Sequence, residues 1–113
     1  YPELIREFMR ATGAEPYVSL AISGQECSAF KPDPEIYLTA MERLGVSAED
    51  CVVVEDSPIG IRAGKASGAL VCALAPRPGV SLDQGEADVV VGSLREVVPL
   101  ALGPVGGKAV SYV

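Results

Sequence analysis

The sequence predicts an α/β fold with a mainly parallel sheet, and three observations carry this prediction. Short apolar segments alternate along the chain with segments whose apolar residues recur at helical spacing. Residues 51–54 are continuously apolar and rich in valine, which is typical of a strand covered on both faces, as in parallel sheets. Glycine or proline stands at several of the boundaries between segments. Helices and strands that alternate in this way favour an α/β fold.

The first part of the chain predicts two helices with a strand between them. Apolar residues at helical spacing begin at Leu4, and Gly13 closes this segment. Residues 17–22 then form a short apolar run that predicts a buried strand. In the next helix, Asp33 can cap the free N–H groups and Pro34 fits the first turn. The apolar stripe of that helix, which Gly45 ends, consists of Ile36, Tyr37, Ala40, Met41 and Leu44.

The third predicted helix carries a regular series of glycines. It follows the strand at residues 51–54 and is opened by Ser57 and Pro58. Glycine within a helix costs about 1 kcal/mol relative to alanine. A glycine at every fourth position therefore indicates that this helix packs closely against a neighbour. The glycines are Gly60, Gly64 and Gly68.

The remaining segments complete one domain. Residues 69–74 and 87–91 are further strand candidates, and Ser93 is placed to cap a final helix. A glycine-rich stretch follows that helix. We therefore expect one domain over residues 1–102 and a tail over residues 103–113.

The composition excludes several classes of function. The formal charge of −6 argues against a nucleic-acid or anionic-membrane partner, because both need a basic face. The apolar runs are far shorter than a membrane span, and no secretory signal is visible. The three cysteines form no closely spaced metal pair, and their odd number is a poor disulfide framework, which indicates a reducing, cytoplasmic setting. They are Cys27, Cys51 and Cys72.

Two adjacent carboxylates, Glu55 and Asp56, follow directly after the strand at residues 51–54. Ligands of open α/β sheets bind beyond the carboxyl ends of the strands. Adjacent carboxylates repel each other when they lose hydration, so a cation is the natural compensation. Carboxylate oxygens suit Mg²⁺, which keeps several waters and shares its shell with phosphate. The alternative is that Asp56 caps the next helix and Glu55 is a solvated strand end, and spacing alone leaves both open.

Lys31 precedes Pro32, which biases it towards an extended conformation and gives its side chain a defined direction. An ammonium group placed in this way can neutralise the charge of a phosphate or a carboxylate. The alternative is a solvated surface lysine. Arg62 and Lys65 fit the exposed face of the third helix, and Arg77 lies in a loop between prolines.

These residues also carry a resemblance to a known family. The run from Lys31 to Tyr37, Lys-Pro-Asp-Pro-Glu-Ile-Tyr, and the run Val-Val-Val-Glu-Asp-Ser-Pro that ends at Pro58 closely resemble motifs III and IV of the haloacid dehalogenase superfamily. The match is to the branch that contains β-phosphoglucomutase, phosphoglycolate phosphatase and related sugar-phosphate phosphatases. The resemblance covers residues 1–102 and implies a Rossmann-like, three-layer fold with a mainly parallel sheet.

The resemblance assigns roles to four residues. It implies that Lys31 steadies an aspartyl nucleophile and the phosphoryl group. It implies that Asp56 is a direct Mg²⁺ ligand and that Glu55 is a direct or water-mediated one. Ser57 is a weaker candidate beside these ligands. Family members that cleave carbon–halogen bonds work without a metal and differ at this segment, so both acids favour Mg²⁺-dependent phosphoryl transfer.

The resemblance also implies parts that this sequence does not contain. The nucleophile of the family lies in an Asp-x-Asp motif on the first strand, and no such motif occurs in these 113 residues. Ser23 lies only 8 residues before Lys31, which is too near for the serine or threonine of motif II. We therefore expect the C-terminal half of a longer enzyme, without strands 1–2 and without the cap that selects the substrate.

The function expected from the sequence is that of a Mg²⁺-dependent phosphatase of small phosphomonoesters, acting through an aspartyl nucleophile outside this chain. A phosphomutase of the same branch remains open, because it would share every residue seen here. A non-catalytic fragment that only complements the N-terminal half is the third reading. The expected partners are a small phosphorylated metabolite and that N-terminal half, with no nucleic acid and no membrane.

The chain alone is expected to be inactive and unable to fold independently. In the family sheet, the first and second strands lie between the strand expected at residues 17–22 and the strand at residues 51–54. Without them, two strand edges would be bare, and bare edges invite aggregation. Thermal unfolding of the purified 113-residue chain should therefore show no cooperative transition, and a cooperative transition of a monomer would contradict this expectation.

Overall fold

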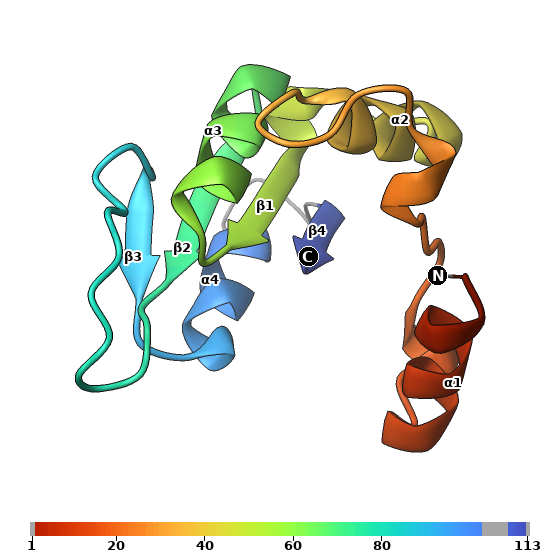
Figure 1. The fold of residues 1–113 in the computed structure, drawn as a ribbon, viewed down its shortest axis with the longest axis horizontal. Coiled ribbons are helices and arrows are strands. Elements are labelled where there is room, and N and C mark those ends of the chain that lie inside the picture. The colour runs from red at the N-terminus through yellow and green to blue at the C-terminus, as the bar shows by residue number, and fades with distance from the viewer. Residues whose placement is uncertain (1, 103–108, 113) are drawn as a thin grey trace.

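The computed structural model describes residues 2–102 and 109–112 (Figure 1). The α-helices are α1 (Pro2–Thr12), α2 (Glu35–Leu44), α3 (Pro58–Ser67) and α4 (Val97–Ala101). The strands are β1 (Cys51–Glu55), β2 (Leu70–Leu74), β3 (Val89–Val91) and β4 (Ala109–Tyr112). Single turns of 3₁₀ helix are η1 (Glu15–Tyr17), η2 (Gly24–Glu26), η3 (Ala48–Asp50) and η4 (Leu94–Glu96). None of the described helices is both long and apolar enough to cross a membrane.

The strands form one parallel sheet in the order β3-β2-β1-β4. In this order β1 is an inner strand, where Val53 pairs with Val71 of β2 and with Ser111 of β4. All five residues of β1 are buried, as expected for a strand covered on both faces. The predicted α/β fold with a parallel sheet is confirmed.

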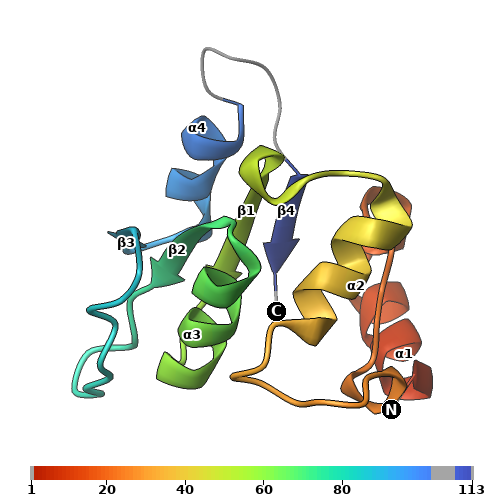
Figure 2. The same ribbon diagram turned by 90° about the horizontal axis from the view of Figure 1, so that it is seen from above.

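The sheet lies between two helical layers. Figure 2 shows α2 and α3 on one face and α4 on the other. Successive side chains of a strand point to opposite faces. Accordingly, Val53 packs in a core with Tyr37 of α2 and Ile61 of α3, whereas Val52 packs in a second core with Val97 of α4. The molecule is therefore a three-layer, Rossmann-like α/β fold.

The predicted start and end of the second helix are confirmed to within one residue. The helix α2 begins at Glu35, and the carboxylate of Asp33 accepts a hydrogen bond of 2.9 Å from the Glu35 N–H. At its other end, Gly45 has a φ of 69°, a left-handed conformation that glycine adopts without steric cost. Pro34 is the N-cap residue, one position before the first turn predicted for it, and the loop that carries Lys31 leads directly into α2.

The strand predicted at residues 17–22 is wrong. The backbone is extended after η1, with Val18 at φ −108° and ψ 118°, but this segment pairs with no other strand in the described part of the chain. An apolar run becomes a strand only where a neighbour accepts and donates its backbone hydrogen bonds. The helix α1 lies on the same side of the molecule as residues 17–22, away from the sheet (Figure 1). Its residues Leu4 and Phe8 are exposed.

The prediction of a tail over residues 103–113 is corrected for its last part. The segment Ala109–Tyr112 forms β4, which pairs in parallel with β1, while residues 103–108 and 113 lie outside the described residues. The bare edge expected along β1 is therefore covered by the chain itself. The physical reason is that backbone N–H and C=O groups of an inner strand need partners, and β4 supplies them.

The glycine series of α3 has the packing role predicted for it at Gly64. A Cβ atom at Gly64 would lie 2.8 Å from Cγ2 of Val71 and 2.9 Å from Cγ1 of Val53. Both distances are shorter than carbon atoms tolerate, and both valines are fully buried in the sheet. The helix α3 can therefore lie close to β1 and β2 only while this position has no side chain.

In the full-length protein, replacing Gly64 by alanine should lower the free energy of unfolding. The added methyl group would push α3 away from the sheet, and overpacking of a core costs about 1–3 kcal/mol. Higher helix propensity would offset about 1 kcal/mol of this cost. Chemical denaturation should show the loss, and Gly24→Ala is the control, because no atom lies within 4 Å of a Cβ at Gly24. Equal effects of both substitutions would contradict the packing role.

Candidate active site

The two adjacent carboxylates at the end of β1 occupy opposite environments. Glu55 is the last residue of the strand and continues the face of Val53, so its side chain lies beneath α2 and α3, where it is only 3% exposed. Asp56 follows the strand and is exposed. Among residues 3–102, its carboxylate makes no hydrogen bond or ion pair. The alternation of the strand therefore buries one acid and leaves its neighbour open to solvent.

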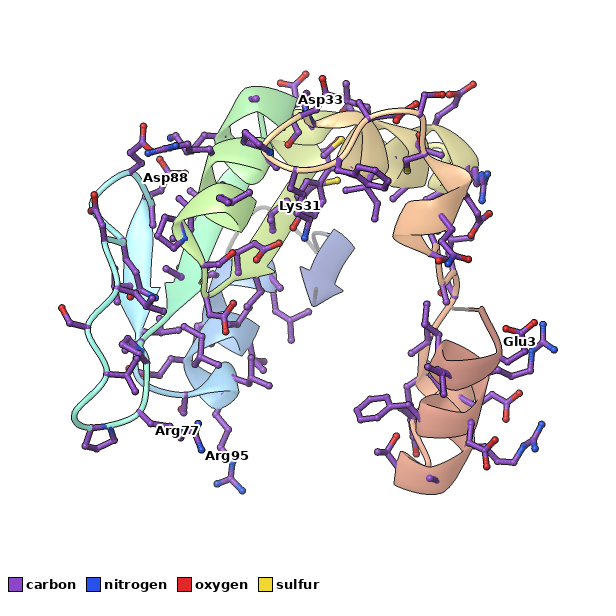
Figure 3. All side chains as sticks on the ribbon, viewed as in Figure 1. Glu3, Lys31, Asp33, Arg77, Asp88 and Arg95 are labelled. Carbon is purple, nitrogen blue, oxygen red and sulfur yellow. The ribbon has the colours of Figure 1, made fainter. Side chains whose placement is uncertain are left out.

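Lys31 reaches the buried acid from the loop before α2. Its ammonium Nζ lies 2.5 Å from Oε1 of Glu55, and its side chain is 23% exposed. Figure 3 shows Lys31 beneath α2, on the side that faces the sheet. The peptide bond between Lys31 and Pro32 is cis. The structure thus brings together Lys31 and Glu55, which are 24 residues apart in the sequence, and Lys31 is not a fully solvated surface lysine.

Tyr37 is a third member of this cluster; from the sequence it was expected only in the apolar stripe of α2 and at the end of the run that resembles motif III. Its hydroxyl donates a hydrogen bond to the same Oε1 of Glu55, and Lys31 Nζ lies 5.1 Å from the centre of its ring. Burial raises the pKa of Tyr37, and the hydrogen bond to Glu55 raises it further, so the hydroxyl stays protonated and remains a donor. A tyrosine within the apolar stripe of a helix is expected to be buried, and its hydroxyl then needs a hydrogen-bond partner. That tyrosine was therefore the one sign in the sequence of a polar contact beneath α2.

The start of α3 forms the other wall of the cluster. Ser57 caps this helix, because its Oγ accepts a hydrogen bond of 3.1 Å from the Gly60 N–H. The cap is therefore Ser57 and not Asp56, which removes the purely capping alternative for Asp56. Gly60 lies against the carboxylate of Glu55, where a Cβ atom would overlap Oε2. Its lack of a side chain makes room for the acid, a role that the glycine series alone did not reveal.

Gln84 connects the ends of two strands beside Asp56. Its side-chain Nε2 donates hydrogen bonds of 2.9 Å to the backbone carbonyls of Asp56, after β1, and of Leu74, at the end of β2. Gln84 was not predicted from the sequence, because it lies in a loop and no local pattern marks its partners. The backbone at Asp56 is thus held by a segment 28 residues further along the chain.

The other basic residues considered from the sequence lie outside this cluster. Arg62 pairs with Glu86 at 3.1 Å and Lys65 with Asp88 at 2.6 Å, which ties the exposed face of α3 to the loop before β3. Arg77 lies on the loop after β2, well apart from Lys31 (Figure 3). Within the described residues no group of three or more acidic, histidine or cysteine side chains is arranged to hold a metal. Any cation beside Asp56 would need further ligands.

The fold and the cluster together define a class of protein. It is a Rossmann-like α/β protein that holds a paired lysine and an open carboxylate at the carboxyl end of an inner parallel strand. That edge of the sheet is where this class binds its ligands.

Comparison with known proteins identifies the family within this class. Residues 1–68 match the family model described as haloacid dehalogenase-like hydrolase, so the chain belongs to that family. It is 44% identical over 62 residues to the phosphorylated carbohydrates phosphatase of Thermotoga maritima, which covers 55% of this chain and 29% of that protein. It is 33% identical over 102 residues to the β-phosphoglucomutase of Mycobacterium bovis, covering 82% of this chain and 39% of that protein.

A solved structure supports the same assignment. The crystal structure of an HAD hydrolase, family IA, variant 3, from Entamoeba histolytica superimposes with a TM-score of 0.68 and 27% sequence identity, covering 85% of this chain and 47% of that one. The predicted membership of the haloacid dehalogenase superfamily is confirmed. The chain spans less than half of the length of each of these three proteins.

In the full-length protein, replacing Gln84 by alanine should lower the free energy of unfolding by about 1–2 kcal/mol, because the carbonyls of Asp56 and Leu74 would lose their shared donor. Chemical denaturation measures this loss. Gln84→Glu is the sharper variant, because an ionised carboxylate cannot donate and would repel both carbonyl oxygens. Gln25→Ala, in an exposed 3₁₀ turn, is the control. A neutral result for Gln84→Glu would show that this link does not hold the strand ends.

Proposed function

We propose that this chain is part of a Mg²⁺-dependent phosphatase of small phosphomonoesters of the sugar-phosphate kind. In this proposal it supplies the charge-neutralising Lys31 and the metal-binding Asp56, and an aspartyl nucleophile outside this chain attacks the substrate. The observation that carries the proposal is the Lys31–Glu55 pair beside the exposed Asp56 at the carboxyl end of β1. Family membership and the names of the related phosphatases agree with it.

The placement of Lys31 supports its proposed role. An ammonium group has three N–H donors, and Glu55 accepts one of them. The remaining exposure of the side chain leaves donors for a phosphoryl oxygen. In the proposed reaction, an aspartate oxygen forms a bond to phosphorus, the ester P–O bond breaks, and the leaving oxygen takes up a proton from a general acid outside this chain. Water then attacks the aspartyl phosphate, which releases inorganic phosphate and restores the aspartate. Lys31 would compensate the negative charge spread over the phosphoryl oxygens.

The residues present fit Mg²⁺ in part. Asp56 offers an exposed, hard oxygen ligand, whereas Oε1 of Glu55 accepts from both Lys31 and Tyr37 and Oε2 lies against Gly60. This supports Asp56 as the direct ligand and Glu55 as an indirect one. Ser57 acts on the same loop by capping α3. A bound Mg²⁺ would be held by Asp56, with Glu55 acting indirectly, and it would supply charge neutralisation at the phosphoryl group.

Two alternatives share the same residues. A phosphomutase is favoured by the 33% identity to a β-phosphoglucomutase over most of this chain. A fragment without activity of its own, completed by an N-terminal half, agrees with the share of its relatives that the chain spans. The proposed partners are a small phosphorylated metabolite, for the two enzymatic readings, and the N-terminal half, which completes the fold. We also propose a reducing, cytoplasmic setting without a nucleic-acid or membrane partner.

Replacing Asp56 by asparagine in the complete enzyme should reduce hydrolysis of a generic aryl phosphate on the order of 100-fold, because a metal ligand loses its charge. Steady-state kinetics over a range of Mg²⁺ concentrations measures the effect, and a chelator should abolish the wild-type activity. The matched control is Asp50→Asn, since Asp50 directly precedes β1 and lies at the opposite end of the strand. Activity that survives chelation would exclude the metal role, and no hydrolysis of any phosphomonoester would exclude the function.

A further inference from the structure

One oxygen of Glu55 serves two donors. Its Oε1 accepts from the Lys31 ammonium at 2.5 Å and from the Tyr37 hydroxyl. Tyr37 is 2% exposed, so its hydroxyl has no access to solvent as a substitute partner. The two donors come from the loop before α2 and from the first turns of α2 itself. The position of this oxygen therefore depends on both of them at once.

The opposite side of the carboxylate is closed by α3. Gly60 lies so near to Oε2 that even a methyl group would collide with it. With Tyr37 on one side and Gly60 on the other, the carboxylate cannot rotate away from Lys31 without meeting the backbone of α3 or breaking the hydroxyl contact. This arrangement fixes Glu55 more firmly than an ion pair with a partly exposed lysine would.

Tyr37 also contacts Lys31 through its ring. The ammonium lies 5.1 Å from the ring centre, so the same side chain attracts the lysine by its face and orders the lysine's partner by its hydroxyl. The two contributions are separable, because phenylalanine keeps the ring and the buried volume and removes only the hydroxyl.

We propose that Tyr37 is a positioning residue for Lys31: through Glu55 it holds the ammonium at a defined place for the transferring phosphoryl group. This inference rests on the proposed function. Loss of the hydroxyl leaves Glu55 with one donor and lets the Lys31–Glu55 pair move as a unit. Small displacements of a charge-compensating group reduce turnover much more than they reduce substrate binding.

The test is a double-mutant cycle in the complete enzyme. Tyr37→Phe should lower kcat about tenfold and change KM by less than about twofold, as expected for a displaced charge-compensating group. In a Lys31→Met background, Tyr37→Phe should cause no further loss of kcat, because there is no ammonium left to position. Tyr17→Phe is the matched control, since Tyr17 is 88% exposed. All assays run well below the melting temperature of the least stable variant.

Two outcomes of the cycle overturn the inference. One is an unchanged kcat in Tyr37→Phe, and the other is an equal loss of kcat in the Lys31 and Lys31→Met backgrounds. A purely structural role of Tyr37 would lower the melting temperature and leave kcat untouched in both.

A second measurement does not depend on activity. Mass spectrometry can follow the rate at which acetic anhydride labels Lys31, which should rise severalfold in Tyr37→Phe and stay unchanged in Tyr17→Phe. An unchanged rate in Tyr37→Phe overturns the positioning role even if the enzyme hydrolyses phosphomonoesters. A raised rate in an enzyme without any phosphatase activity sustains the positioning of Lys31 and overturns only the proposed function.

Discussion

The burial of the Glu55 carboxylate is the constraint on which the rest of this site depends. A charge that is almost completely removed from water is tolerated only with close partners, and removing one partner of such a pair costs about 3–5 kcal/mol. The chain meets this demand with Lys31 from a loop, the Tyr37 hydroxyl from α2 and a glycine on α3 that leaves room. Two helices and a loop are thereby fixed relative to the end of β1. The acid organises the site before any ligand binds.

The division of labour between Glu55 and Asp56 follows from the geometry of a strand. Neighbouring residues of β1 face opposite sides of the sheet, and Glu55 falls on the side that α2 and α3 cover. Asp56 comes after the last sheet pairing and stays exposed, with its backbone carbonyl held by Gln84. Two carboxylates that look equivalent in the sequence therefore differ in what they can do. Glu55 can hold the ammonium of Lys31 in place, and Asp56 can offer its carboxylate oxygens to a ligand from solution.

Local patterns predicted most of the fold, and the exceptions share one physical cause. The helices α2 and α3 and the strands β1 and β2 were predicted correctly, because caps, helical periodicity and continuous apolar runs are properties of the segments themselves. The strand expected at residues 17–22 is wrong, because a strand exists only with a partner, and partners are set by tertiary structure.

The strand β4 was missed for the same reason. Its residues carry no strong strand pattern, and they are ordered by pairing with β1.

The same distinction applies within the candidate site. Lys31, Glu55 and Asp56 were predicted because their flanking prolines and the strand end mark them in the sequence. Tyr37 and Gln84 were not predicted as site residues, because their importance comes from distant partners. Tyr37 contacts Glu55, 18 residues away, and Gln84 contacts Asp56, 28 residues away.

Lys31 can still interact with a substrate although it is paired with a buried acid. The ion pair with Glu55 leaves two of the three N–H donors of Lys31 unused by that acid. A lysine without such a partner would lose more side-chain entropy than Lys31 when it binds a phosphoryl group, and its ammonium would approach that group in many orientations. An ammonium already tied to Glu55 has lost most of that freedom during folding. In the proposed function, the buried acid therefore makes Lys31 a better partner for a developing negative charge, and the exposed acid beside it remains available to the metal.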